Sequence, residues 1–404
     1  MCGPPFTIPI PIPEAGSPRC LEIARQILPV FKSRYLALFP LMHIPADVSV
    51  ETFVRERPLT ARAISVICEK SRTRQIELGA ATRQEVSRRV VAGGERNLDL
   101  LQTLLICMNW QIYFTPSRRG GMGMFINIAK HVIADMGLNR PVGMVLACPK
   151  EPSLIGRPKH EIRTDEECRM VVACFALSAM ACVSIKTEPM KWSPQLNKAC
   201  EQLSANTDIK GDAVLVALAR MSRVAVDAYS IIQQIADDQV SAQQALPHIR
   251  VLRTMLDQVK STLTQTQLQD STVRCYSESI RCGLHAEDLW AYLSTAVYSV
   301  TIQIHEVALY GITPSSPVQP TLEYQRIEYL TACLHACKDC LDNYLSIPAV
   351  GLNMVTILAF SNSCQVNRSI PQVFSRLIRT NIGPVQPERA RLPGMGSICS
   401  PHHC

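Results

Sequence analysis

Hydrophobic residues recur along most of the chain with the spacing of α-helices. In the first half, the positions i, i+3, i+4 and i+7 are occupied by Leu101, Leu104, Leu105 and Met108. This spacing predicts a helix with one buried face. A second helix is predicted from about Phe125 to Gly137, where glycine suits the helix end. The run from Met170 to Ile185 is apolar on every side, which indicates a helix in the centre of the core.

The second half of the chain repeats its apolar residues in alternating steps of four and three. The repeats occupy residues 214–235, 252–263, 289–300 and 327–344. Steps of this kind keep one apolar seam on one side of each helix, which suits antiparallel helices packed side by side. The sequence shows no strand-like alternation of useful length. We therefore predict an all-α fold, built as a large multi-helix array or bundle.

Proline, glycine and the loss of periodicity divide the chain into four predicted parts. These are a Pro-rich extended lead-in at 1–17, a helical region at 18–205, a continuation of the helical bundle at 206–370, and a mostly disordered tail at 371–404. A long loop is expected at residues 140–163, because its prolines and glycines leave no sustained period. Residues 313–320 are expected to form a loop or linker.

Composition narrows the class of protein. Hydrophobic residues make up 47% of the 404 positions, enough for a large core. The longest uncharged apolar run, 170–185, is shorter than the ~18–20 residues of a membrane-spanning helix. The prolines of the lead-in are incompatible with a helical signal peptide, so we expect a chain on the reducing side of the cell, with no membrane partner.

Charge gives little support for direct nucleic-acid binding. The net charge of +7 is a mild excess of 41 basic over 34 acidic residues. The densest arginines are interrupted by neutral or acidic residues, and they are Arg72, Arg74, Arg83, Arg88 and Arg89, followed by Arg118 and Arg119. A solvated helix face is therefore favoured over a nucleic-acid patch.

The 17 cysteines are scattered along the chain. Several lie in apolar helical stretches, where free cysteine acts as a small hydrophobe; these are Cys68, Cys107, Cys174 and Cys182. The densest group contains Cys333, His335, Cys337 and Cys340. Three of these cysteines share one helix face, which favours core packing. A reactive or metal-binding thiol pair is the alternative, although a second Cys-x-x-Cys motif for structural zinc is missing.

Other patterns that suggest chemistry each lack a required part. The glycines of Gly120–Phe125 follow a predicted helix, whereas a dinucleotide loop follows a strand. His305-Glu306 does not continue as a zinc-protease motif, and Asp237-Asp238 lacks the third aspartate of a terpene-type metal site. Asn367 begins a glycosylation sequon without a secretory signal. The terminal His402, His403 and Cys404 would have to be ordered at a large entropic cost to bind a metal ion.

We therefore assign no catalytic, cofactor-binding or metal-ligating residue, and we predict that the protein is not an enzyme.

Between residues 21 and 204, several short motifs occur in a specific order. Arg57-Pro58 opens an apolar helix, and Leu98–Gln102 leads to Trp110. Asp135–Arg140 then ends the next helix, and Glu167 and Arg169 open the helix after the Pro-rich gap. In this order the region resembles the regulatory middle region of fungal zinc-cluster transcription factors, which carry a binuclear six-cysteine module. Each motif also has a structural interpretation as a helix start, a helix end or a packing anchor.

The resemblance implies a DNA-binding module with six closely spaced cysteines and two zinc ions. The chain begins with only Cys2 and Cys20, eighteen positions apart. We therefore carry over no zinc ligand and no DNA contact. Zinc is expected only if such a module exists elsewhere. Its absence from this chain has two explanations: the chain is truncated or mis-spliced, or the protein regulates transcription without direct DNA binding.

The resemblance implies a nuclear transcriptional regulator, specific for a pathway or gene cluster. Its expected partners are the transcription machinery or co-regulator proteins, with a homodimer and a small-molecule effector as further expectations. DNA would be reached through a module outside this chain. The alternative is an all-helical scaffold or adaptor unconnected with transcription.

Overall fold

The computed structural model describes residues 17–36, 39–114, 122–141, 163–185, 187–206, 208–262, 286–310, 320–346, 365–367, 369–373 and 375. Within these ranges the regular elements are helices and no strand occurs, so the predicted all-α fold is confirmed. The predicted lead-in up to residue 16 lies outside the described residues. So do most of the predicted loops at 140–163 and 313–320 and nearly all of 371–404.

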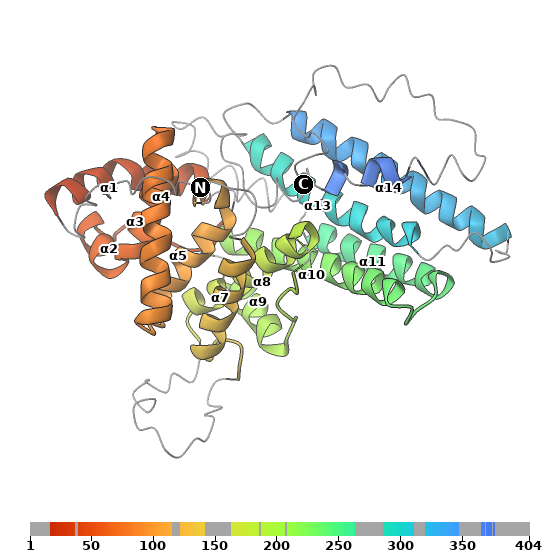
Figure 1. Ribbon diagram of the computed structural model, residues 1–404, viewed down its shortest axis with the longest axis horizontal. Coiled ribbons are helices and arrows are strands. Elements are labelled where there is room, and N and C mark those ends of the chain that lie inside the picture. The colour runs from red at the N-terminus through yellow and green to blue at the C-terminus, as the bar shows by residue number, and fades with distance from the viewer. Residues whose placement is uncertain are drawn as a thin grey trace, which may run out of the picture.

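The first half of the chain forms short and medium helices. They are α1 (Pro18–Val30) with the π-turn η1 (Phe31–Tyr35), α2 (Val50–Glu56), α3 (Pro58–Cys68), α4 (Arg72–Ser87) with the π-turn η2 (Arg88–Ala92), α5 (Leu98–Asn109), α6 (Gln111–Phe114) and α7 (Met122–Asp135). In Figure 1, α1 to α4 form one end of the molecule, and α5 and α7 lead towards its middle.

The second half contains the longest helices. They are α8 (Asp165–Ile185), α9 (Pro194–Ala205), α10 (Lys210–Ala236), α11 (Ala242–Thr262), α13 (Ala286–Glu306) with the 3-10 turn η5 (Val307–Leu309), and α14 (Pro320–Ser346). Helices α8, α9 and α10 lie in the middle of the molecule, and α11, α13 and α14 form the opposite end (Figure 1). Neighbours in the chain are therefore mostly neighbours in space.

Polar side chains fix where many of these helices begin. Ser17, Ser49, Asn97 and Ser193 each accept a hydrogen bond from the backbone N–H three residues later. Such caps satisfy N–H groups that have no partner within the helix. Helix α8 begins with a reciprocal capping box, in which the Thr164 hydroxyl accepts from the Glu167 N–H at 3.2 Å and the Glu167 carboxylate accepts from the Thr164 N–H at 3.1 Å.

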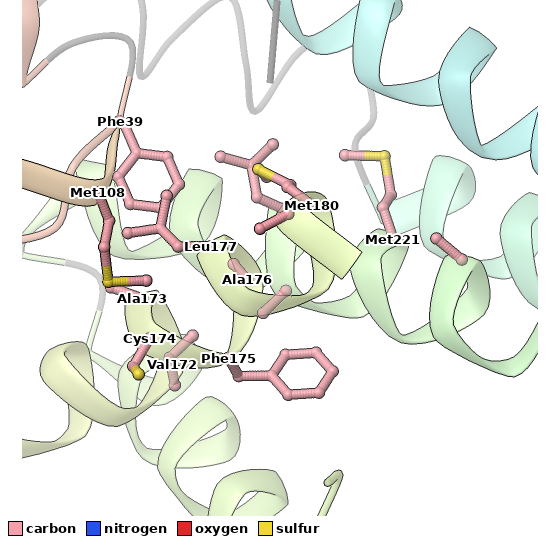
Figure 2. Packing of buried hydrophobic residues seen from close by; sticks show 14 of the residues in the cluster. Phe39, Met108, Val172, Ala173, Cys174, Phe175, Ala176, Leu177, Met180 and Met221 are labelled. Carbon is pink, nitrogen blue, oxygen red and sulfur yellow. The ribbon is translucent and has the colours of Figure 1, made fainter. Parts of the chain in front are cut away.

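Helices α5 and α8 form the centre of the core. The prediction that α8 is surrounded on all sides is confirmed, since residues 168–182 are all buried. The predicted face of α5 is buried, and burial extends to every residue from Asp99 to Asn109, which its spacing alone does not indicate. The polar residues of α5 are buried as well, through contacts that its spacing does not reveal. Figure 2 shows side chains from three other segments around α8, namely Phe39, Met108 and Met221.

The predicted seams of the second half are largely confirmed. Every residue of the α10 seam from Val214 to Ile235 is buried. On α14 the buried face is rotated from the predicted seam, because Ile327, Leu334 and Leu341 are only half-buried. The residues of α14 that are buried are Tyr329, Leu330, Cys333, Ala336, Cys337 and Cys340. This rotation aligns α14 with α13, against which it packs most extensively.

The buried apolar side chains form one cluster that extends from Leu28 to Val373. The division of the helical part at residue 205 stays a prediction. Among the helices of the described ranges, none combines the length and apolarity that a membrane span requires.

Candidate functional site: a polar junction between the motif-bearing helices

The motif Arg57-Pro58 begins helix α3, but its first N–H groups are capped from another helix. Pro58 occupies the first turn, where its missing N–H costs nothing. The next two N–H groups, of Leu59 and Thr60, donate to the carboxylate oxygens of Asp99 at 3.1 and 2.9 Å. Asp99 belongs to the first turn of α5, and Asn97 caps that helix. Asp99 thus lies in the first turn of its own helix and caps the neighbouring helix α3.

Two threonines extend this contact between α3 and α5. The hydroxyl groups of Thr60 and Thr103 both donate to the backbone oxygen of Asp99, at 3.2 and 2.8 Å. Both threonines are fully buried, and Asp99 is 7% exposed. All three buried polar side chains therefore have hydrogen-bond partners, as is usual for polar groups in an apolar core.

The same junction includes the start of α8. Arg57 binds Glu166 through one guanidinium nitrogen, which lies 2.8 and 3.0 Å from the two carboxylate oxygens. Gln102 of α5 donates to the same carboxylate at 2.7 Å. Glu166 thus joins α3, α5 and α8. Arg57 and Gln102 belong to two of the motifs identified in the sequence, and they meet at the residue before Glu167, which belongs to another.

Arg169 forms a buried ion pair with Asp212 of α10. Its Nε and Nη2 donate to the two carboxylate oxygens at 2.6 and 2.8 Å. The side chains are only 5% and 1% exposed, so the pair is shielded from solvent and salt. Burial, together with the neighbouring Arg169 charge, lowers the pKa of His43 below its usual range. The pair links α8 to the long helices of the second half.

The motif Asp135–Arg140 forms the end of α7. Gly137 has a φ of +68°, and the Leu138 N–H returns to the Ile133 oxygen at 2.9 Å, as in a Schellman cap. Arg163 donates to the backbone oxygens of Gly137 and Arg140 at 2.7 and 2.6 Å. Arg140 thus contributes its carbonyl oxygen to this helix end, and Arg163 supplies the positive charge.

Trp110 anchors the packing between α5 and the first segment of the chain, as expected. It is fully buried, and its ring lies edge-on to those of Phe31 and Tyr35, with centroids 5.7 and 5.8 Å away. Its indole N–H is buried without a hydrogen-bond partner.

The cysteine group on α14 is divided between two faces. Cys333, Cys337 and Cys340 are buried, whereas His335 is exposed. The predicted core packing of the three cysteines is thus confirmed. Burial raises the pKa of Cys340 to about 12, which disfavours the reactive thiolate. Within the described part of the chain, no three His, Cys, Asp or Glu side chains are placed to hold a metal ion.

The cysteines of the other apolar helices follow the same rule. Cys107, Cys174 and Cys182 are buried, and Cys68 is half-buried at the end of α3. Burial raises the pKa of Cys68, Cys174 and Cys182 to about 12. These thiols act as small apolar side chains, as predicted.

Three of the five predicted arginines, Arg74 of α4 and Arg88 and Arg89 of η2, pair with nearby carboxylates, whereas Arg72 bonds to Gln75 and the Nε of Arg83 is buried without a partner. Arg88 and Arg89 both donate to Glu85, whose pKa falls to about 2, first because of Arg88 and then because of Arg89. Arg74 lies 3.4 Å from Glu69. The interpretation as a solvated, charge-balanced helix face fits Arg74, Arg88 and Arg89, but not the half-buried Arg83. The other basic pair, Arg118-Arg119, lies outside the described residues.

The remaining candidate residues do not form a common site. Asp237 and Asp238 follow α10, where Asp238 adopts a φ of +55°. His305 and Glu306 are buried at the end of α13, and Ser369 of the sequon is itself buried and donates to Glu306. Met122 to Phe125 begin α7, whereas Gly120, Gly121 and residues 402–404 lie outside the described residues.

Sequence reasoning missed the partners that complete the junction, namely Thr60, Arg163, Glu166 and Asp212. A signal existed for Asp212, because Arg169 borders an apolar helix and must find an opposite charge when buried. The sequence does not show which carboxylate supplies it. The charged groups and hydroxyls of the junction are thus engaged in contacts that hold the helices together.

No family model matches the chain, and no solved structure shows a significant match. Two curated fungal proteins are similar to it. Transcription factor opdL of Penicillium oxalicum is 24% identical over 360 residues, covering 86% of this chain and 59% of that protein. Transcription factor himD of Aspergillus japonicus is 22% identical over 341 residues, covering 81% and 52%.

The chain thus spans somewhat more than half the length of these relatives. Both matches extend over most of this chain, so its similarity is to proteins named as fungal transcription factors.

Proposed function

We propose that this chain is the regulatory region of a nuclear fungal transcriptional regulator of the zinc-cluster type, specific for a pathway or gene cluster. The observation that supports it best is similarity to two named transcription factors over more than four fifths of the chain. The ordered motifs give independent support, because they coincide with the helix starts and ends that hold α3, α5, α7 and α8 together.

The region acts through protein contacts rather than through chemistry of its own. Its buried carboxylates and guanidinium groups are engaged in joining helices, as in the pair between Arg169 and Asp212. Arg74, Arg88 and Arg89 pair with Glu69 and Glu85, and we assign no DNA contact to the described helices. Partners are the transcription machinery or co-regulators, and a small molecule that alters helix packing is a further partner.

Tethering tests this proposal. The full chain fused to a foreign DNA-binding domain is expected to raise or lower transcription of a reporter carrying that domain's site. Asp212→Ala, which leaves Arg169 buried without its partner, is expected to abolish the effect by disrupting the fold. A silent fusion would contradict the proposal, provided that circular dichroism shows a folded protein and microscopy places it in the nucleus.

The seams of α10, α11, α13 and α14 favour a second candidate, a helical scaffold or adaptor. Affinity purification separates the two. Recovery of transcription machinery favours the regulator, and recovery of a stable cytoplasmic assembly favours the scaffold. A gel shift of the purified chain adds a third result: salt-sensitive DNA binding would indicate direct phosphate contacts.

A further inference from the structure

The last residue of α5 differs from the other polar residues of that helix. Asp99, Gln102 and Thr103 are buried, and each has a hydrogen-bond partner in a neighbouring helix or in its own. Asn109 is fully buried, yet neither its amide nitrogen nor its amide oxygen has a partner. Such a group is rare in a folded protein, because a buried amide without hydrogen bonds destabilises the fold.

A second unmet donor follows at once in the chain. The indole N–H of Trp110 is also buried without a partner. The end of α5 therefore carries unpaired donors on two consecutive residues and one unpaired acceptor. Unsatisfied buried groups call for an explanation such as a bound molecule or a functional strain.

The chemistry of the amide selects what can bind there. A primary amide presents a donor and an acceptor side by side, which pair best with a second amide or an undissociated carboxylic acid. A charged ligand is disfavoured, because Asn109 is fully buried and an ion beside it would lose its hydration. The complementary ligand is therefore neutral, with one amide-like head group and an apolar body.

The residue before Asn109 in the chain is a buried methionine, Met108. Methionine fills irregular space and repacks more readily than branched residues. Since Asn109 has no exposed surface, a ligand gains access only when the end of α5 opens, and its binding favours that open state.

We propose that Asn109 is the recognition group of an internal site for a small neutral carboxamide or carboxylic acid. The role of such a ligand as an effector rests on the proposed regulatory function, whereas the binding site does not. Binding at the end of α5 would reach α3 and α8 directly, because α5 packs against both helices.

The first test is the stability of the ligand-free full chain. Asn109→Leu removes the unpaired amide and keeps a similar size, so it is expected to raise Tm. The matched control, Thr103→Val, removes a paired hydroxyl of the same helix and is expected to lower Tm. A fall in Tm for Asn109→Leu would overturn the proposal, since it would show that an internal water already satisfies the amide.

The second test is binding of a defined probe to the same proteins. Isobutyramide at millimolar concentration is expected to raise the Tm of the wild-type chain, and 3-methylbutan-2-one, which lacks the N–H donors, is expected to raise it less. The difference should vanish in Asn109→Leu. Equal shifts by both compounds, or an amide-specific shift that persists in Asn109→Leu, would overturn the site.

The two proposals fail in distinguishable ways. An amide-specific Tm shift together with a silent reporter fusion would contradict the regulatory function and leave the binding site in place. An active fusion without any amide-specific shift would do the reverse.

Discussion

The buried pair between Arg169 and Asp212 gives the sharpest test of how this helical body is held together. Removing one partner leaves a charge in the core, whereas replacing both with apolar residues of similar size removes the charge altogether. The informative comparison is therefore Asp212→Ala against the double variant Arg169→Met with Asp212→Leu.

The geometry of the pair sets the size of the effect. Two hydrogen bonds of 2.6 and 2.8 Å join side chains that are 5% and 1% exposed. Asp212→Ala leaves the guanidinium of Arg169 buried and unpaired, which costs about 3–5 kcal/mol. The free energy of unfolding of the double variant is expected to equal that of the wild type or to exceed it by about 1–4 kcal/mol.

Urea unfolding followed by circular dichroism and tryptophan fluorescence measures both variants. The double variant is expected to have a free energy of unfolding equal to or higher than that of the wild type. The value for Asp212→Ala is expected to lie well below both. Equal destabilisation by the single and double variants would refute the reasoning, because it would mean that the pair stabilises the fold by attraction rather than by satisfying a buried charge. High salt should leave the result unchanged, since the pair is shielded from solvent.

Further predictions concern the helix starts and the surface. Asp99→Ala is expected to lower the free energy of unfolding by about 2–4 kcal/mol, because it removes two caps of α3 in the core, whereas the ordinary cap variant Asn97→Ala costs about 1 kcal/mol. Urea titrations of both variants check this, and equal losses would contradict it. Gly79→Ala is expected to cost about 1–3 kcal/mol, because its Cβ would lie 2.5 Å from the Tyr113 backbone oxygen; a neutral change in Tm would refute the close packing of α4 on α6. Since the pKa of Glu85 is lowered to about 2 by Arg88 and Arg89, its contribution to stability is present above about pH 4.5 and is lost as the pH falls towards 2. Tm measured across this range should therefore fall less in Glu85→Gln than in the wild type, and identical slopes would contradict the assignment.

The overall helical architecture follows from local patterns in the sequence. The four-three spacing of the α10 seam indicates a helix with one apolar side, and the structure buries this side along its length. The all-round apolar character of α8 likewise predicts its central place. Caps such as Asn97 and Gly137 lie where residue type alone indicates a helix boundary.

The features that sequence patterns could not supply depend on contacts between distant residues. Helix α5 has polar positions that look exposed, yet Asp99 and Gln102 are buried because α3 and α8 provide their partners. On α14 the buried face is set by α13 rather than by the helix's own strongest seam. The unpaired amide of Asn109 is invisible in the sequence, because an asparagine at a helix end ordinarily indicates exposure.

The most direct measurement of the central claim is transcript profiling after deletion of the gene in its source organism. The account predicts a coordinated change in a limited set of transcripts. Reintroducing the wild-type gene into the deletion strain should restore these transcripts, and so should the gene for the double variant of Arg169 and Asp212. The gene for Asp212→Ala should not restore them. An unchanged transcript profile, under conditions in which the intact strain makes the folded protein, would contradict a role in transcription.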